Sequence, residues 1–253
     1  MPQQISIQIL GNFTITVDGQ KTEALSSRSR KGVTLLIYLI LRRGKCATVQ
    51  QMIHDLWGAS PGVRPENALK TRICRLRALL NSVAPRLGRC IFSEPGGYSY
   101  LALPGVEVDA LELLDIIDLL SGDPDLPEDT YMAYYQRAME LYNGELFTTG
   151  ELVGDVEQSS WLRRGFLDIA AGYARLLESR NDYAALAEVC RKALDQEPLA
   201  EVFRAALIRA LLAMNRPEDA RREYAQAVRM SFQMLNGAPG EELQALGKKL
   251  RAK

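Results

Sequence analysis

Residues 64–80 read RPENALKTRICRLRALL, and after a short connection residues 92–103 read FSEPGGYSYLAL. At 3.6 residues per turn the first stretch is a helix with one apolar stripe, made of Leu69, Ile73, Leu76 and Leu80. The second stretch has a Gly-Gly pair between alternating residues, which predicts a hairpin with Gly96-Gly97 at its turn. A helix with one apolar side, followed by such a hairpin, is typical of a winged helix that binds DNA.

The polar side of this helix carries residue types that suit the major groove, because Arg, Asn and Thr can bond to base edges there. The side opposite the apolar stripe holds Arg64, Asn67, Thr71, Cys74 and Arg75, with Lys70 and Arg77 on one flank and Arg72 on the other. A surface helix with solvated cations is the alternative interpretation of this stretch alone. The rest of the chain argues against that alternative.

Charge is distributed unevenly along a chain whose formal net charge is zero. Residues 1–107 hold 14 Lys and Arg against 6 Asp and Glu, whereas residues 108–253 hold 17 against 25. A basic module beside an acidic one indicates that the first meets phosphates and the second meets something else. Surface charge on a helical module can also serve solubility alone.

Composition excludes several classes of protein. With 253 residues, 47% apolar and 25% charged, the chain can fold as one large or two ordinary domains. The N-terminal MPQQISIQIL lacks the regions of a signal peptide, and the longest apolar run, residues 33–41, is too short to span a bilayer. We therefore expect a soluble cytoplasmic protein without a membrane span.

Motifs for catalysis, cofactors and metals are missing from the sequence. No GxxxxGK[ST], GxGxxG, HExxH or GxSxG is found. The four cysteines are scattered without a CxxC pair, which excludes the usual zinc spacings and fits reduced thiols. The single histidine, His54, is expected to be structural. We predict a protein that is not an enzyme and uses no cofactor or metal.

Two strands and two helices are predicted before the decisive helix. Residues 5–9 and 13–17 alternate in polarity, which predicts an antiparallel pair closed by Asp18-Gly19. A helix capped by Ser27 should run to Arg43, and its apolar interior makes it the central helix of the domain.

The first turn of that helix carries Arg28, Arg30 and Lys31, although the helix dipole alone prefers acidic residues there. We predict that these cations contact phosphates, and we expect the same of Arg64 and Arg72; a solvated helix end is the alternative. Thr48 and Gln51 then form a capping box for a helix over residues 49–57. With the loop over residues 58–65, this completes a helix-turn-helix in which the helix over 64–80 is the reader.

Five segments in this order resemble one family. They are LSSRSRKGVTLLIYLIL, ATVQQMIHDLWG, ENALKTRICRLRALL, EPGGYSYLAL and VDALELL. Their order and spacing are similar to those of SARP-type bacterial activators (Streptomyces antibiotic regulatory proteins), over nearly the full chain. In that family an OmpR-type winged helix precedes a bacterial transcriptional activation domain.

The resemblance implies roles for individual residues. The reader helix would enter the major groove, with base-reading roles for Asn67, Lys70, Thr71, Arg75 and Arg77. The wing, with Gly96, Gly97 and Tyr98, would reach an adjacent minor groove. The family usually has a basic residue just before PGGY, where this chain has Glu94. A carboxylate there repels phosphate, which puts the wing contact in question; Arg86 and Arg89 are the possible substitutes.

From residue 109 onward the chain predicts successive amphipathic helices with a 34-residue self-similarity. Tyr173, Leu177, Asn181, Leu186, Cys190 and Ala193 recur as Leu207, Leu211, Asn215, Ala220, Tyr224 and Ala227. This is the tetratricopeptide (TPR) pattern, with units over residues 167–200 and 201–234, a divergent helix pair before them and a final helix from Gly240. Such arrays bind peptides or proteins; a rigid spacer or dimerisation scaffold is the alternative.

We therefore predict a mainly α protein with a small β component. A winged helix-turn-helix domain over residues 1–105 precedes a TPR-like domain over residues 108–253. The predicted function is a transcriptional activator that binds direct repeats in double-stranded DNA as a homodimer, with centres about one helical turn apart. The resemblance implies that it recruits RNA polymerase. The alternatives are an interaction scaffold with a non-reading winged helix, which Glu66 and Glu94 favour, and a ligand-gated repressor.

Overall fold

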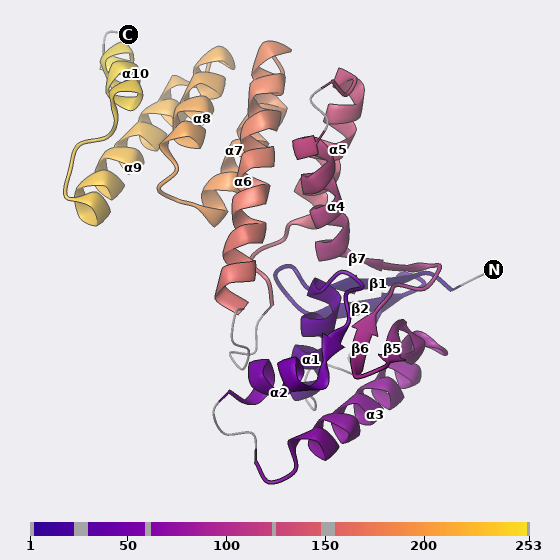
Figure 1. Ribbon diagram of the computed structural model, residues 1–253. Helices are drawn as coiled ribbons and strands as arrows, with labels where there is room; N and C mark the ends of the chain where they lie inside the picture. The colour runs from indigo at the N-terminus through magenta and orange to yellow at the C-terminus, as the bar shows by residue number, and fades with distance from the viewer. Residues whose placement is uncertain (1–2, 23–29, 59–61, 123–124, 148–154, 252–253) are drawn as a thin grey trace. The chain divides into compact units, whose positions relative to one another are not determined.

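The computed structural model describes residues 3–22, 30–58, 62–122, 125–147 and 155–251. The chain is mainly helical with a few short strands, as predicted. It forms two compact units (Figure 1), one of Met1–Leu119 with Leu141–Leu162, the other of Leu120–Glu140 with Arg163–Lys253. The first unit thus contains residues on both sides of the predicted domain boundary at 105–108, and that boundary stays a prediction.

The first unit contains a four-stranded sheet in the order β3-β2-β1-β7. Its strands are β1 (Ile5–Gln8), β2 (Thr14–Val17), β3 (Gln20–Thr22) and β7 (Val106–Val108). β1 pairs antiparallel with β2, as predicted, and parallel with β7. The prediction for Asp18-Gly19 was wrong, because this turn joins β2 to β3. Both residues have positive φ, 48° and 82°, as a two-residue hairpin turn requires.

Three helices form the core of the winged helix. They are α1 (Arg30–Leu41), α2 (Val49–Trp57) and α3 (Pro65–Val83). α1 is buried over most of its length, which confirms its central position; the predicted cap Ser27 lies outside the described residues. The capping box of α2 is present, with the Gln51 N–H donating to Thr48 Oγ1 at 3.2 Å and the Thr48 N–H to Gln51 Oε1 at 3.1 Å.

The hairpin follows the 3-10 helix η1 (Leu87–Cys90) along the chain and belongs to a second small sheet. Its strands are β4 (Ala47–Thr48), β5 (Ile91–Glu94) and β6 (Gly97–Tyr100), in the order β4-β6-β5. The turn is Pro95-Gly96 rather than Gly96-Gly97, because Gly97 already pairs with Glu94 in the ladder. Gly96 provides the positive φ of the turn, 81°. Gly97 permits close packing, because a Cβ there would lie 2.2 Å from the Ala47 carbonyl oxygen.

Residues beyond the hairpin complete the first unit. At the start of α4 (Asp109–Gly122), the buried Asp109 carboxylate accepts the backbone N–H groups of Ile9 and Leu10 at 2.9 Å. Farther along the chain, Leu146 forms an antiparallel bridge with Leu10. These contacts link positions about 100 or more residues apart, so no local pattern of the sequence indicates them.

The second unit is built from helices that succeed one another along the chain. They are α5 (Glu128–Leu141), α6 (Asp155–Ser179), α7 (Tyr183–Gln196), α8 (Glu201–Ala213), α9 (Pro217–Leu235) and α10 (Glu241–Arg251). Residues 155–162 of α6 and residue 141 of α5 belong to the first unit. The predicted final helix is confirmed as α10. An apolar core runs from Ala170 to Leu250, and the apolar repeated positions belong to it or pack against it, whereas Asn181 and Asn215 are exposed.

The backbone confirms the 34-residue repeat. Asn181, after α6, and Asn215, after α8, both have φ of 57°. In each case the next N–H bonds back to the preceding helix, from Asp182 to the Leu177 carbonyl at 3.0 Å and from Arg216 to the Leu211 carbonyl at 2.8 Å. Asparagine is tolerated in this left-handed position, where it ends a helix.

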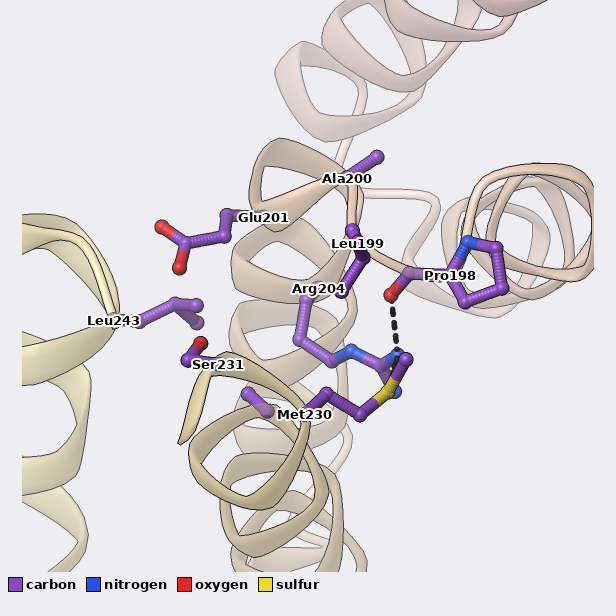
Figure 2. A pocket seen from close by; sticks show the side chains of 9 residues that line it. Pro198, Leu199, Ala200, Glu201, Arg204, Met230, Ser231 and Leu243 are labelled. Atoms are coloured by element: carbon purple, nitrogen blue, oxygen red, sulfur yellow. Dashed lines mark hydrogen bonds between the residues drawn. The ribbon is translucent and has the colours of Figure 1, made fainter. Parts of the chain in front are cut away.

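A buried arginine ties α8 to α9 within the array. Arg204 is 5% exposed, and its guanidinium donates to the Glu223 carboxylate at 2.8 Å and to the Pro198 carbonyl at 3.1 Å. Figure 2 shows this side chain lying between Pro198 and Met230. The carboxylate partner and the carbonyl offset the cost of burying the charge. The sequence pattern did not indicate this ion pair.

Candidate nucleic-acid interface

The reader helix α3 has the two-sided character that its sequence predicts. Leu69, Ile73, Leu76 and Leu80 are each at most 1% exposed, where α3 packs on α1 and α2. The opposite side is exposed, including the candidate base readers Asn67, Lys70, Thr71 and Arg75 and the phosphate candidate Arg64. α3 lies beside the β5–β6 hairpin (Figure 1), so the helix and the wing belong to one surface.

Three cations on this surface are unpaired. Among the described residues, the side chains of Arg64, Lys70 and Arg75 form no ion pair or hydrogen bond. We call these three residues the unpaired α3 cations. The Thr71 hydroxyl donates to the Asn67 backbone carbonyl at 2.8 Å. The Asn67 side chain is exposed. Unpaired cations keep their full attraction for phosphate or for guanine edges.

Arg77 has a different environment from the other candidate readers. Its Nε and Nη2 donate to the Ile91 carbonyl at 3.2 and 2.8 Å, and Nη2 also donates to Ser93 Oγ at 3.0 Å. The guanidinium carbon lies 5.9 Å from the centre of the Tyr98 ring. Arg77 therefore ties α3 to strand β5, a role that base reading, its predicted function, does not require.

Arg72 occupies the other flank of α3 in a similar way. Its guanidinium lies over the Trp57 ring of α2, 4.2 Å from the ring centre, and the side chain is half-buried. Cation–π contacts of this kind stabilise by about 1 kcal/mol. The two flank arginines thus hold the reader helix to α2 on one side and to the wing on the other.

The other phosphate candidates are placed at the ends of helices. Arg30 and Lys31 lie in the first turn of α1, are exposed and form no ion pair within the described part of the chain. Arg28 lies outside the described residues. The possible wing substitutes Arg86 and Arg89 are exposed at η1, where Arg86 has a positive φ of 75°.

A groove of about 590 Å³ separates α3 from the wing. It is lined by Thr48, Val49, Gln50, Glu66, Lys70, Ser93, Glu94, Gly96, Gly97 and Tyr98. Glu94 also lies beside Cys46, whose thiol pKa is raised by burial and by that carboxylate. The wing candidates Gly96, Gly97 and Tyr98 thus line one wall of this groove. No pattern of the sequence indicates that Glu66 and Glu94 share a groove.

Metal-binding clusters and membrane-spanning helices are both missing from the described part of the chain. There, no three His, Cys, Asp or Glu side chains are grouped so that they could hold a metal ion. No helix among the described residues is long and apolar enough to cross a bilayer.

Comparison with known families assigns both parts of the chain. Residues 23–99 match the family described as transcriptional regulatory protein, C terminal, and residues 127–251 match the bacterial transcriptional activator domain. The first match contains α1, α2, α3 and the hairpin. The second contains the helical repeats.

Two regulators from Streptomyces coelicolor are similar over most of this chain. The regulatory protein AfsR is 28% identical over 96% of this chain, which spans only 24% of AfsR. The transcriptional regulator RedD is 26% identical over 93% of this chain and 67% of RedD. Among solved structures, Mycobacterium tuberculosis EmbR in complex with a low-affinity phosphopeptide shares the fold. It has a TM-score of 0.63 and 16% identity over 99% of this chain and 65% of that one.

Proposed function

Because this chain belongs to the SARP-type transcriptional regulators, we propose that it activates transcription by binding specific promoter sequences through α3 and the wing. The observation that carries the proposal is the set of unpaired α3 cations on the exposed side of the reader helix. Phosphate contacts give affinity and base contacts give specificity. We assign base reading to Asn67, Lys70, Thr71 and Arg75 and phosphate contacts to Arg64, Arg30 and Lys31.

The anchored flank arginines support this assignment. A reader helix gains specificity only if its exposed side chains are held in a fixed register against the duplex. Arg72 on Trp57 and Arg77 on β5 fix both flanks of α3. We therefore assign Arg77 a positioning role, in which it sets the wing relative to the reader helix.

We further propose that the protein binds direct repeats as a homodimer and that its second part contacts RNA polymerase. Supporting this are the match of residues 127–251 to the bacterial transcriptional activator domain and the acidic balance of residues 108–253. TPR-like arrays present surfaces for protein partners.

Capture of genomic DNA fragments by the purified protein, followed by sequencing, tests the DNA-binding proposal. We expect a recurrent direct-repeat motif whose centres are about one helical turn apart. Arg75→Ala should keep the repeat spacing and lose the base preference at one position of the motif. Arg164→Ala, an exposed arginine of α6 without an ion pair among the described residues, should keep it. Weak binding without a motif would contradict the proposal and favour an interaction scaffold.

Transcription from a captured promoter with purified RNA polymerase tests the direction of regulation. Added wild-type protein is expected to raise the transcript level, and Arg75→Ala is expected to need a higher protein concentration for the same rise. A fall in transcript with the wild-type protein would show a repressor and contradict activation.

A further inference from the structure

The groove between α3 and the wing contains three charged side chains that face a common space. Glu66 and Lys70 lie one turn apart on α3, and Glu94 lies on β5 at the opposite wall. None of the three forms an ion pair among the described residues. Glu66 is exposed and is the second residue of α3, directly before the candidate reader Asn67.

Two carboxylates that form no ion pair among the described residues line this groove. If α3 lies in the major groove and the wing in the adjacent minor groove, the DNA strand between them passes through this space. A carboxylate that faces a phosphate there lowers affinity for every sequence alike. A carboxylate that faces a base edge acts differently, because its effect depends on the base.

Only some base edges attract a carboxylate. In the major groove, guanine presents two acceptors and thymine an acceptor with a methyl group, so both disfavour Glu. Cytosine presents the N4 amino donor with no acceptor beside it. Adenine has a donor next to the N7 acceptor, a pair that suits Gln or Asn better than Glu. Residues near the N-terminus of a reader helix are among those that reach base edges.

We propose, on the basis of the function proposed above, that Glu66 is a specificity-determining residue that selects cytosine at one position of the target site. Glu94, on the wing wall, faces the phosphate strand and reduces affinity without selecting a base. The two carboxylates of one groove thus have different effects, although they carry the same charge. A carboxylate in the first turn of a helix also favours the helix dipole, so the test must separate base selection from helix stability.

Selection from a randomised duplex library by the full chain, followed by sequencing, tests this difference. Wild-type protein should select cytosine at one position of each half-site. Glu66→Gln should lower that preference by about 5- to 20-fold and shift it towards adenine, because a lost base contact changes discrimination by factors of this order. Glu94→Gln is the matched control, with the same loss of charge in the same groove. It should leave base preferences unchanged and raise affinity for all sequences.

Glu66→Asp separates base reading from the helix dipole. It keeps the negative charge in the first turn but shortens the side chain by one methylene, so it should keep the melting temperature and lose the cytosine preference. A wild-type motif that is unchanged by Glu66→Gln and Glu66→Asp would overturn this proposal alone. A wild-type protein that selects no motif would overturn the proposed function as well.

Discussion

Three arginines of the repeat array and three cations of the reader helix use their charge in opposite ways. In the repeat array, Arg204 pairs with Glu223 at 2.8 Å, and Arg209 and Arg180 each reach a glutamate at 2.6 Å. On the reader helix, Arg64, Lys70 and Arg75 have no partner among the described residues. A paired arginine is committed to the fold, whereas an unpaired one retains its attraction for DNA. Paired and unpaired cations are equal in the amino-acid composition. Only the structure shows which of them form ion pairs.

Removal of a paired cation should have the largest effect. Arg204→Met leaves Glu223 without its partner, and we expect the free energy of unfolding of the second unit to fall by about 3–5 kcal/mol. Urea denaturation measures this loss. Arg164→Ala, at an exposed position, should change stability by less than about 0.5 kcal/mol. Equal losses for the two variants would break the distinction between paired and unpaired arginines.

Two carboxylates, one in each unit, make the stability of the two units depend on pH in different ways. Asp109 in the first unit forms no ion pair with any residue that the structure describes, and burial raises its pKa from 3.8 to about 6 despite three backbone N–H donors. Because the folded pKa lies above the unfolded one, its contribution to stability is present at low pH and is lost as pH rises through about 6. That difference in pKa corresponds to about 3 kcal/mol.

Glu178 in the second unit behaves in the opposite way. Its hydrogen bond to Arg209 lowers its pKa below the ordinary 4.5. Its contribution to stability is therefore present above that pH and is lost as pH falls.

Denaturation across a pH series separates the two groups. The unfolding free energy of wild type minus that of Asp109→Asn should fall between about pH 4 and about pH 7, whereas the same difference for Glu178→Gln should fall towards acid. Parallel pH profiles for the two variants would contradict the account.

Removal of an unpaired cation should affect binding and leave the fold intact. Arg75→Ala is expected to weaken binding to the captured site by about 1–3 kcal/mol and to relax base preference at one position. Its unfolding free energy should match wild type. Fluorescence anisotropy with the site and with single-base variants gives both quantities. Unchanged affinity would show that the base-reading surface is not the side of α3 that carries Arg75.

The smallest effect is expected for a cation that contacts only phosphate. Lys31→Ala should weaken binding equally for all sequences and reduce the slope of log affinity against log salt by about 1. A titration on the target site and on an unrelated duplex checks this. A loss confined to the target site would instead place Lys31 at a base.

Local patterns predicted most of the elements. The apolar stripe of α3, the Thr48–Gln51 capping box and the turns at Asn181 and Asn215 each follow from residues close in sequence, and all are present. The turn at Asp18-Gly19 was assigned to the wrong pair of strands, because alternation alone does not say which strands a turn joins.

Long-range contacts could not be predicted, because a local pattern of residues does not indicate its distant partner. The pairing of β7 with β1 joins residues about 100 positions apart, and neither strand indicates its partner. In the candidate site, the exposed face of α3 was predictable from its helical period. The bonds of Arg77 to β5 were not, because they depend on how the hairpin folds back onto the helix.

Sequence reading by α3 is tested most directly by two affinities of the full chain, one for the captured site and one for an unrelated duplex of equal length. Both are measured over a range of salt concentrations. We expect both affinities to fall steeply with salt and the site to be bound at least about 1,000-fold more tightly near physiological salt. Equal affinities for the two duplexes at every salt concentration would contradict the claim that α3 reads sequence.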